Sequence, residues 1–74
     1  MNTGQLVRMA NQIGAFFDAM PDRAEARAGV VDHIRAFWAP SMRRSLLAHL
    51  DDHQGAGLTA FVAQALAEGR ARLA

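Results

Sequence analysis

Apolar side chains recur every three or four residues along most of this chain, and the pattern breaks at only three places. This spacing is typical of a helix with one buried face, and it predicts a first helix over residues 3–20. The breaks are Pro21, Pro40 and the segment DDHQGAG from Asp51 to Gly57. The apolar residues of the first helix are Leu6, Met9, Ile13, Phe16, Phe17 and Met20. Asn2 or Thr3 can cap it.

Residues that favour helix starts predict where the second helix begins. Asp22 stands three residues before Glu25, as in a capping box, so this helix should start there and run to about Phe37. We expect its inner face to consist of Ala24, Val30 or Val31, Ile34, and Phe37 or Trp38.

Pro40 disfavours helical geometry at Ala39, so we expect a bend between Trp38 and Ser41 and then a third helix. That helix carries Met42, Leu46, Leu47 and Leu50. After the glycine-containing loop, a last helix carries Leu58, Phe61, Val62, Ala65 and Leu66. Residues 68–74 become polar and are expected to fray. The whole pattern predicts one all-α domain over residues 1–74, a small bundle of three to four short helices.

Composition excludes several classes of function. The chain has no Cys, so it offers no thiolate for a disulfide, a zinc site or an iron–sulfur cluster. A formal net charge of +1 is too small to create the basic field that nucleic-acid binding needs. No apolar run approaches the roughly 18 residues that span a bilayer, and the first residues do not resemble a leader. We therefore expect a cytoplasmic protein with no nucleic-acid or membrane partner.

We also expect no catalytic, cofactor-binding or metal-ligating residue in this chain. His49 and His53 stand four apart, as in helical zinc sites, but only Asp52 is near enough to add a ligand. The alternative is that the histidines face solvent near a helix C-terminus, where the helix dipole favours positive charge. Ser41 and Thr59 suit helix starts better than a nucleophilic triad.

Several residues suit contact with another protein better than a core. Gly14 costs about 1 kcal/mol relative to alanine within a helix, which a close backbone contact would explain, either inside the bundle or with a partner. Around the bend we expect Phe37 to point inward, Trp38 to be half-buried, and the arginines to reach a partner. The candidate interface residues are Met9, Asn11, Gln12, Phe17, Trp38, Pro40, Met42, Arg43 and Arg44.

Two blocks of this sequence resemble the delta subunit of NAD-dependent molybdenum formate dehydrogenases. They are LVRMANQIGAFF from Leu6 to Phe17 and HIRAFWAPSMRRSLLAHL from His33 to Leu50. The proline before the second helix and the GAGL segment also fit, so the resemblance covers nearly the whole chain.

The resemblance implies an accessory subunit of a cytoplasmic complex that oxidises formate to carbon dioxide and reduces NAD. In that family an alpha subunit carries the molybdenum cofactor and iron–sulfur clusters, and beta and gamma subunits carry FMN and further clusters. The chain would then dock on the alpha subunit through its first helix and the bend from Phe37 to Arg44. The alternative is a stand-alone helical regulator that binds protein, or nucleic acid through Arg35, Arg43 and Arg44.

Overall fold

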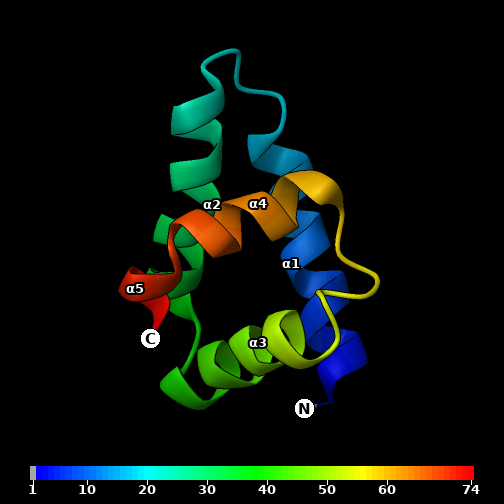
Figure 1. Ribbon diagram of the computed structural model, residues 1–74. Coiled ribbons are helices and arrows are strands. Elements are labelled where there is room, and N and C mark those ends of the chain that lie inside the picture. Colours follow the sequence, from blue (N-terminus) through cyan, green and yellow to red (C-terminus); the bar gives the residue numbers. More distant parts are fainter. Residues whose placement is uncertain (1) are drawn as a thin grey trace.

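An antiparallel pair of helices organises the molecule. The computed structural model describes residues 2–74, and in this range it has five helices and no strand. The helices are α1 (Thr3–Phe17), α2 (Arg23–Phe37), α3 (Pro40–Asp52), α4 (Ala60–Glu68) and α5 (Arg70–Leu73). The pair consists of α1 and α2; α4 crosses both, while α3 lies across one end of the pair (Figure 1). The all-α prediction is confirmed, with a one-turn fifth helix in addition to those expected.

Side-chain caps determine where three of the helices begin. In each, a side-chain oxygen accepts a hydrogen bond from a backbone N–H of the first turn, which would otherwise lack a partner. The α3 start differs, because Pro40 occupies its first position and Ala39 before it is extended. The capping side chains are Asn2 for α1, Asp22 for α2 and Thr59 for α4.

The core lies where the first four helices meet. Its largest side chain is Trp38, only 6% exposed, whereas Phe37 is 75% exposed. The expectation that Phe37 points inward and Trp38 is half-buried is therefore wrong. Trp38 follows Ile34 by four residues and so shares its inner face. The core cluster consists of Leu6, Ala10, Val30, Val31, Ile34, Trp38, Leu46, Leu47, Val62, Ala65, Leu66 and Leu73.

The buried face of α1 is rotated from the one that its apolar stripe predicts. Ala10 and Gly14 are buried, while Phe16 is exposed. A Cβ atom placed on Gly14 would lie 2.3 Å from Cγ2 of Val62, so the missing side chain lets α4 approach α1 closely. Of the two explanations for Gly14, the contact inside the bundle is the one observed. The larger stripe residues Met9, Ile13 and Phe17 lie partly buried at the edge.

The helix α1 also ends three residues earlier than predicted. It stops at Phe17 rather than Met20, and the chain turns before Pro21. Arg23 fastens this turn, because its Nη1 donates to the carbonyl oxygens of Asp18 (2.9 Å) and Met20 (3.1 Å). These bonds satisfy backbone groups that the helix end leaves unpaired.

The C-terminal segment packs on the bundle instead of fraying. Leu73 is 1% exposed, and the Arg35 guanidinium donates to the carbonyl of Arg72. Arg72 also pairs with Asp32, and Arg70 with Asp51. Both pairs are about half exposed, so they contribute little stability. Burial of Leu73 is the stronger reason that the expected fraying does not occur.

The glycine-containing loop joins α3 to α4. Gly55 and Gly57 adopt positive φ angles of 66° and 88°, a backbone region in which glycine lacks the steric penalty of other residues. The loop prediction is confirmed here, although Asp51 and Asp52 still belong to α3. Among residues 2–74, no helix is long and apolar enough to cross a membrane.

Candidate functional site

A row of aromatic rings crosses the seam between α1 and α2. We call Phe16, Phe17, His33 and Phe37 the aromatic strip. The ring centroids of Phe16 and Phe17 are 5.0 Å apart, and those of His33 and Phe37 are 4.8 Å apart. Between these pairs, the centroids of Phe17 and His33 are 6.3 Å apart. Phe16 and Phe37, at the two ends, are each 75% exposed.

The strip lies on the side of the helix pair that faces away from α4. On α1, Gly14 contacts Val62 of α4, and Phe16 follows Gly14 by two residues, about 200° around a helix of 3.6 residues per turn. On α2, Val31 packs against Gly69 at the end of α4, and His33 follows Val31 by the same step. Both exposed surfaces therefore point away from the helix that covers the pair.

Phe17 is the member of the strip that fills the seam between α1 and α2. A Cβ atom placed on Gly29 would lie 2.4 Å from Cδ1 of the Phe17 ring, so α2 accommodates this ring only because position 29 has no side chain. Phe17 is partly buried and packs on the core, while Phe16 beside it stays in solvent. One ring of this adjacent pair therefore lies at the rim of the core, and the other contributes to the surface.

Three of the predicted interface residues lie along the strip. Phe17 belongs to it, and Gln12 is exposed one turn before Phe16. Met9 precedes Phe16 by two turns and is partly buried against the core. These three residues lie on one side of α1, and their contact with a partner stays a prediction.

Asn11 instead serves the fold. Its Nδ2 donates to the carbonyl of Gly57 (2.9 Å), and its Oδ1 accepts from the backbone N–H of Thr59 (3.1 Å). These two bonds fasten the loop before α4 to the middle of α1. The amide that sequence analysis assigned to a partner thus has both of its polar ends engaged within the chain.

Asn11→Ala should lower the free energy of unfolding by about 1–3 kcal/mol, because each lost hydrogen bond contributes about 0.5–1.5 kcal/mol. Urea unfolding followed by circular dichroism measures the change. Gln12→Ala on the exposed side of the same helix is the control and should stay within about 0.5 kcal/mol of the parent. Equal effects of the two substitutions would contradict the bridging role.

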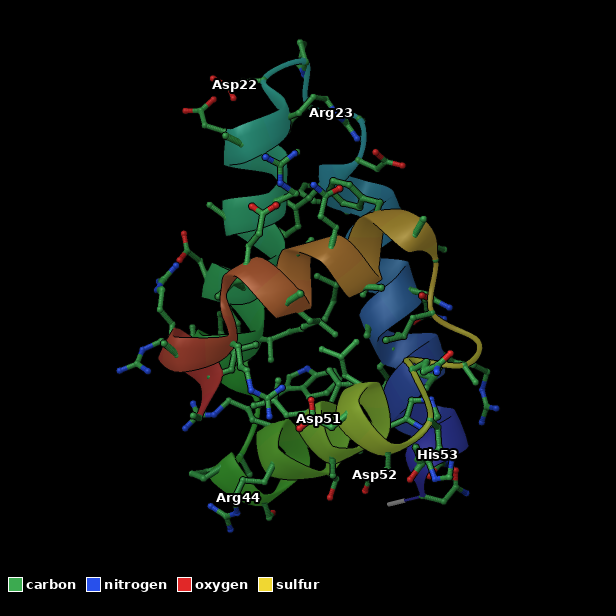
Figure 2. The ribbon with its side chains drawn as sticks, in the orientation of Figure 1. Asp22, Arg23, Arg44, Asp51, Asp52 and His53 are labelled. Carbon is green, nitrogen blue, oxygen red and sulfur yellow. The ribbon has the colours of Figure 1, made fainter. Side chains whose placement is uncertain are left out.

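The bend between α2 and α3 is less available than its sequence indicates. Trp38 lies in the core, and Met42 packs against it. Pro40 is exposed, and Arg44 points from α3 into solvent (Figure 2). Arg43 is partly buried, and its Nη1 donates to the carbonyl of Arg35 at 3.0 Å. That carbonyl belongs to the last turn of α2, so Arg43 caps the end of this helix.

Arg43→Ala should lower the free energy of unfolding by about 1 kcal/mol. Bonds from charged donors contribute about 1.5–3 kcal/mol, and the loss is reduced because Nε of Arg43 is buried without a hydrogen-bond partner among the described residues. Thermal unfolding of the variant measures the effect. The exposed neighbour gives the control, since Arg44→Ala should change stability by no more than about 0.5 kcal/mol.

The two histidines border a groove between the start of α1 and the end of α3. Figure 2 shows His53 beside the first turn of α1. The His49 and His53 ring centroids are 5.5 Å apart, and Nε2 of His49 donates to the carbonyl of Ala56 (2.7 Å). Within residues 2–74, no three His, Asp or Glu side chains come together as metal ligands would. The groove, about 670 Å³, is lined by Thr3, Gly4, Val7, Arg8, Asn11, His49, His53, Ala56 and Gly57.

Comparison with known proteins identifies the family. The model of the family described as NADH-dependent formate dehydrogenase delta subunit FdsD matches residues 5–66 of the 74-residue chain. The chain belongs to this family. Neither the curated proteins nor the solved structures gave a match.

The family assignment gives the exposed surfaces a context. A delta subunit of formate dehydrogenase forms a complex with other subunits of that enzyme. The matched region contains the whole aromatic strip and the bend, but ends before α5.

Sequence reasoning missed the exposure of Phe37. The usable signal was the pair of adjacent aromatics, Phe37 and Trp38, since neighbours on a helix point about 100° apart and cannot both enter a small core.

Proposed function

We propose that this chain is a non-catalytic accessory subunit of a cytoplasmic NAD-dependent molybdenum formate dehydrogenase. It docks on the alpha subunit that bears the molybdenum cofactor and stabilises that subunit or assists its assembly. The match to the delta-subunit family carries this proposal. The exposed aromatic strip supports it, because exposed large apolar side chains grouped on one side are typical of surfaces that bind another protein.

Three of the polar side chains that could have carried chemistry have structural uses. Thr59 caps α4, Asn11 fastens the loop, and His49 binds a backbone carbonyl of that loop. These roles support an accessory function rather than a second catalytic centre in the complex.

The iron–sulfur clusters of such a complex do not fit this chain. These clusters are held by cysteine thiolates, and the chain has no cysteine. In this proposal the clusters, the molybdenum cofactor, FMN and the NAD site belong to the alpha, beta and gamma subunits. This chain would contribute to formate oxidation only by stabilising the alpha subunit or assisting its assembly.

The stand-alone regulator has less support. Of the three arginines considered for nucleic acid, Arg35 donates to the carbonyl of Arg72, and Arg43 donates to that of Arg35. These bonds hold both side chains against the bundle, which limits the directions in which they can reach a phosphate. Arg44 points into solvent, and Arg35, although exposed, is held by its bond to Arg72.

The deciding experiment removes this chain from its native host and adds it back. Without it, we expect the alpha subunit to contain less molybdenum or to lose formate-dependent NAD reduction faster on storage. Activity, metal content and the lifetime of the purified complex are measured in the deletion and add-back strains. A complex that is unchanged in all three without the chain would overturn the proposal.

A further inference from the structure

The aromatic strip presents apolar surface that no other part of residues 2–74 covers. Within that range Phe16 and Phe37 are the large apolar side chains left exposed, each 75%, while most of the others are buried or packed against the core. A chain of 74 residues buries a smaller fraction of its surface than a larger protein, so two exposed phenylalanines reduce the apolar area available to its core. Their placement is explained if another molecule covers them.

The strip itself contains no Asp, Glu, Lys or Arg. On α1, Gln12 lies one turn and Met9 two turns before Phe16. On α2, Gly29 and Ala36 flank His33, and the first charged residue of this row is Glu25, one turn before Gly29. The ion pair of Asp18 with Arg23 lies beyond Phe17, at the turn between α1 and α2. Because the strip has no charged group for a partner to neutralise, it favours an uncharged apolar surface as the occupant.

The shape of the strip fits a helix. It lies on an antiparallel helix pair, and on its other side this pair is already crossed by the helix α4 (Figure 1). Along α2 the strip reaches from Gly29, beneath Phe17, to Phe37, which is about 12 Å or two helical turns. A helix with apolar residues at positions i, i+3 or i+4, and i+7 covers such a length.

We propose that the aromatic strip is where an uncharged, apolar helix face of the molybdenum-bearing subunit docks. The inference rests on the proposed function, which supplies the partner, and it adds the surface. The occupant would sandwich α1 and α2 between itself and α4. The family assignment favours another subunit over a second copy of this chain, since a delta subunit is named for its place among different subunits.

The test compares strip variants with a bend variant in the complex. Formate dehydrogenase purified from the strain that lacks this chain is titrated with the tagged full-length chain, and the dissociation constant is measured. Phe16→Ser combined with Phe37→Ser should weaken binding by roughly thirty-fold or more, as for truncated hot spots. Arg44→Ser, on an exposed residue of the bend, should leave it within about threefold. Thermal unfolding should show that all variants fold like the parent.

Each other outcome has a distinct meaning. If the parent chain binds well and the double variant binds equally well, the strip is not the docking surface, and the accessory role is unaffected. Failure of the parent chain to bind would refute the proposed function itself. If sedimentation shows that the parent chain alone is a dimer and that the double variant is a monomer, the occupant is a second copy and the inference is wrong.

Discussion

Trp38→Ala is expected to lower the free energy of unfolding by about 3–5 kcal/mol, the range for removing a large aromatic from a core. Trp38 is almost fully buried and joins side chains from several helices at the α2–α3 bend. Small domains are stable by about 5–15 kcal/mol, so the variant should be largely unfolded well below the melting temperature of the parent. Far-UV circular dichroism during urea titration measures this without the tryptophan as a probe.

Phe37→Ala is the matched control. It removes the adjacent aromatic from a side chain that is mostly in solvent, so the free energy of unfolding should change by no more than about 0.5 kcal/mol. A large loss for Phe37→Ala with a small one for Trp38→Ala would show that the inward and outward assignments are reversed.

Gly14→Leu is expected to destabilise the fold by about 3 kcal/mol, the upper end of the usual range for overpacking. A side chain at position 14 would collide with the buried methyl group of Val62, and valine has little freedom to rotate away. The helices α1 and α4 would have to separate. Ala15→Leu, one residue further and exposed, is the control and should change stability by no more than about 0.5 kcal/mol. Urea unfolding measures both.

A second pair of variants isolates the cause of this loss. In the parent, Gly14→Ala should be destabilising, because the new methyl group would lie against Val62. In a chain that already carries Val62→Ala the collision is removed, and the same substitution should stabilise α1 by about 0.5–1 kcal/mol through helix propensity. If Gly14→Ala has the same sign in both backgrounds, close packing on Val62 is not the reason for the glycine.

The structural roles of Trp38 and Arg43 decide which substitutions can test docking. Trp38 and Arg43 are attractive targets by residue type, yet one fills the core and the other caps α2. Substituting them would unfold or loosen the chain and would reduce binding for that reason alone. Phe16 and Phe37 are better targets, because they contribute to exposed surface and little to the core.

The sequence predicted the helices well because their signals are local. Apolar spacing marked the helical segments, Asp22 and Thr59 marked starts through the oxygens they offer to free N–H groups, and Pro40 marked the bend. The sequence resemblance also indicated the family that the comparison then showed. The extent of the C-terminal helix was missed, because the charges of Arg70 and Arg72 obscured one anchoring leucine.

The sequence by itself therefore determined the all-α class, the approximate helix limits and the family. Only the tertiary structure decided which side of each helix is covered. Periodicity gives the angle between residues but not the direction of the neighbouring helix, so Phe37 and Trp38 were equally good core candidates. The close approach of α4 to Gly14 fixed the rotation of α1, and this rotation left Phe16 in solvent beside the seam with α2.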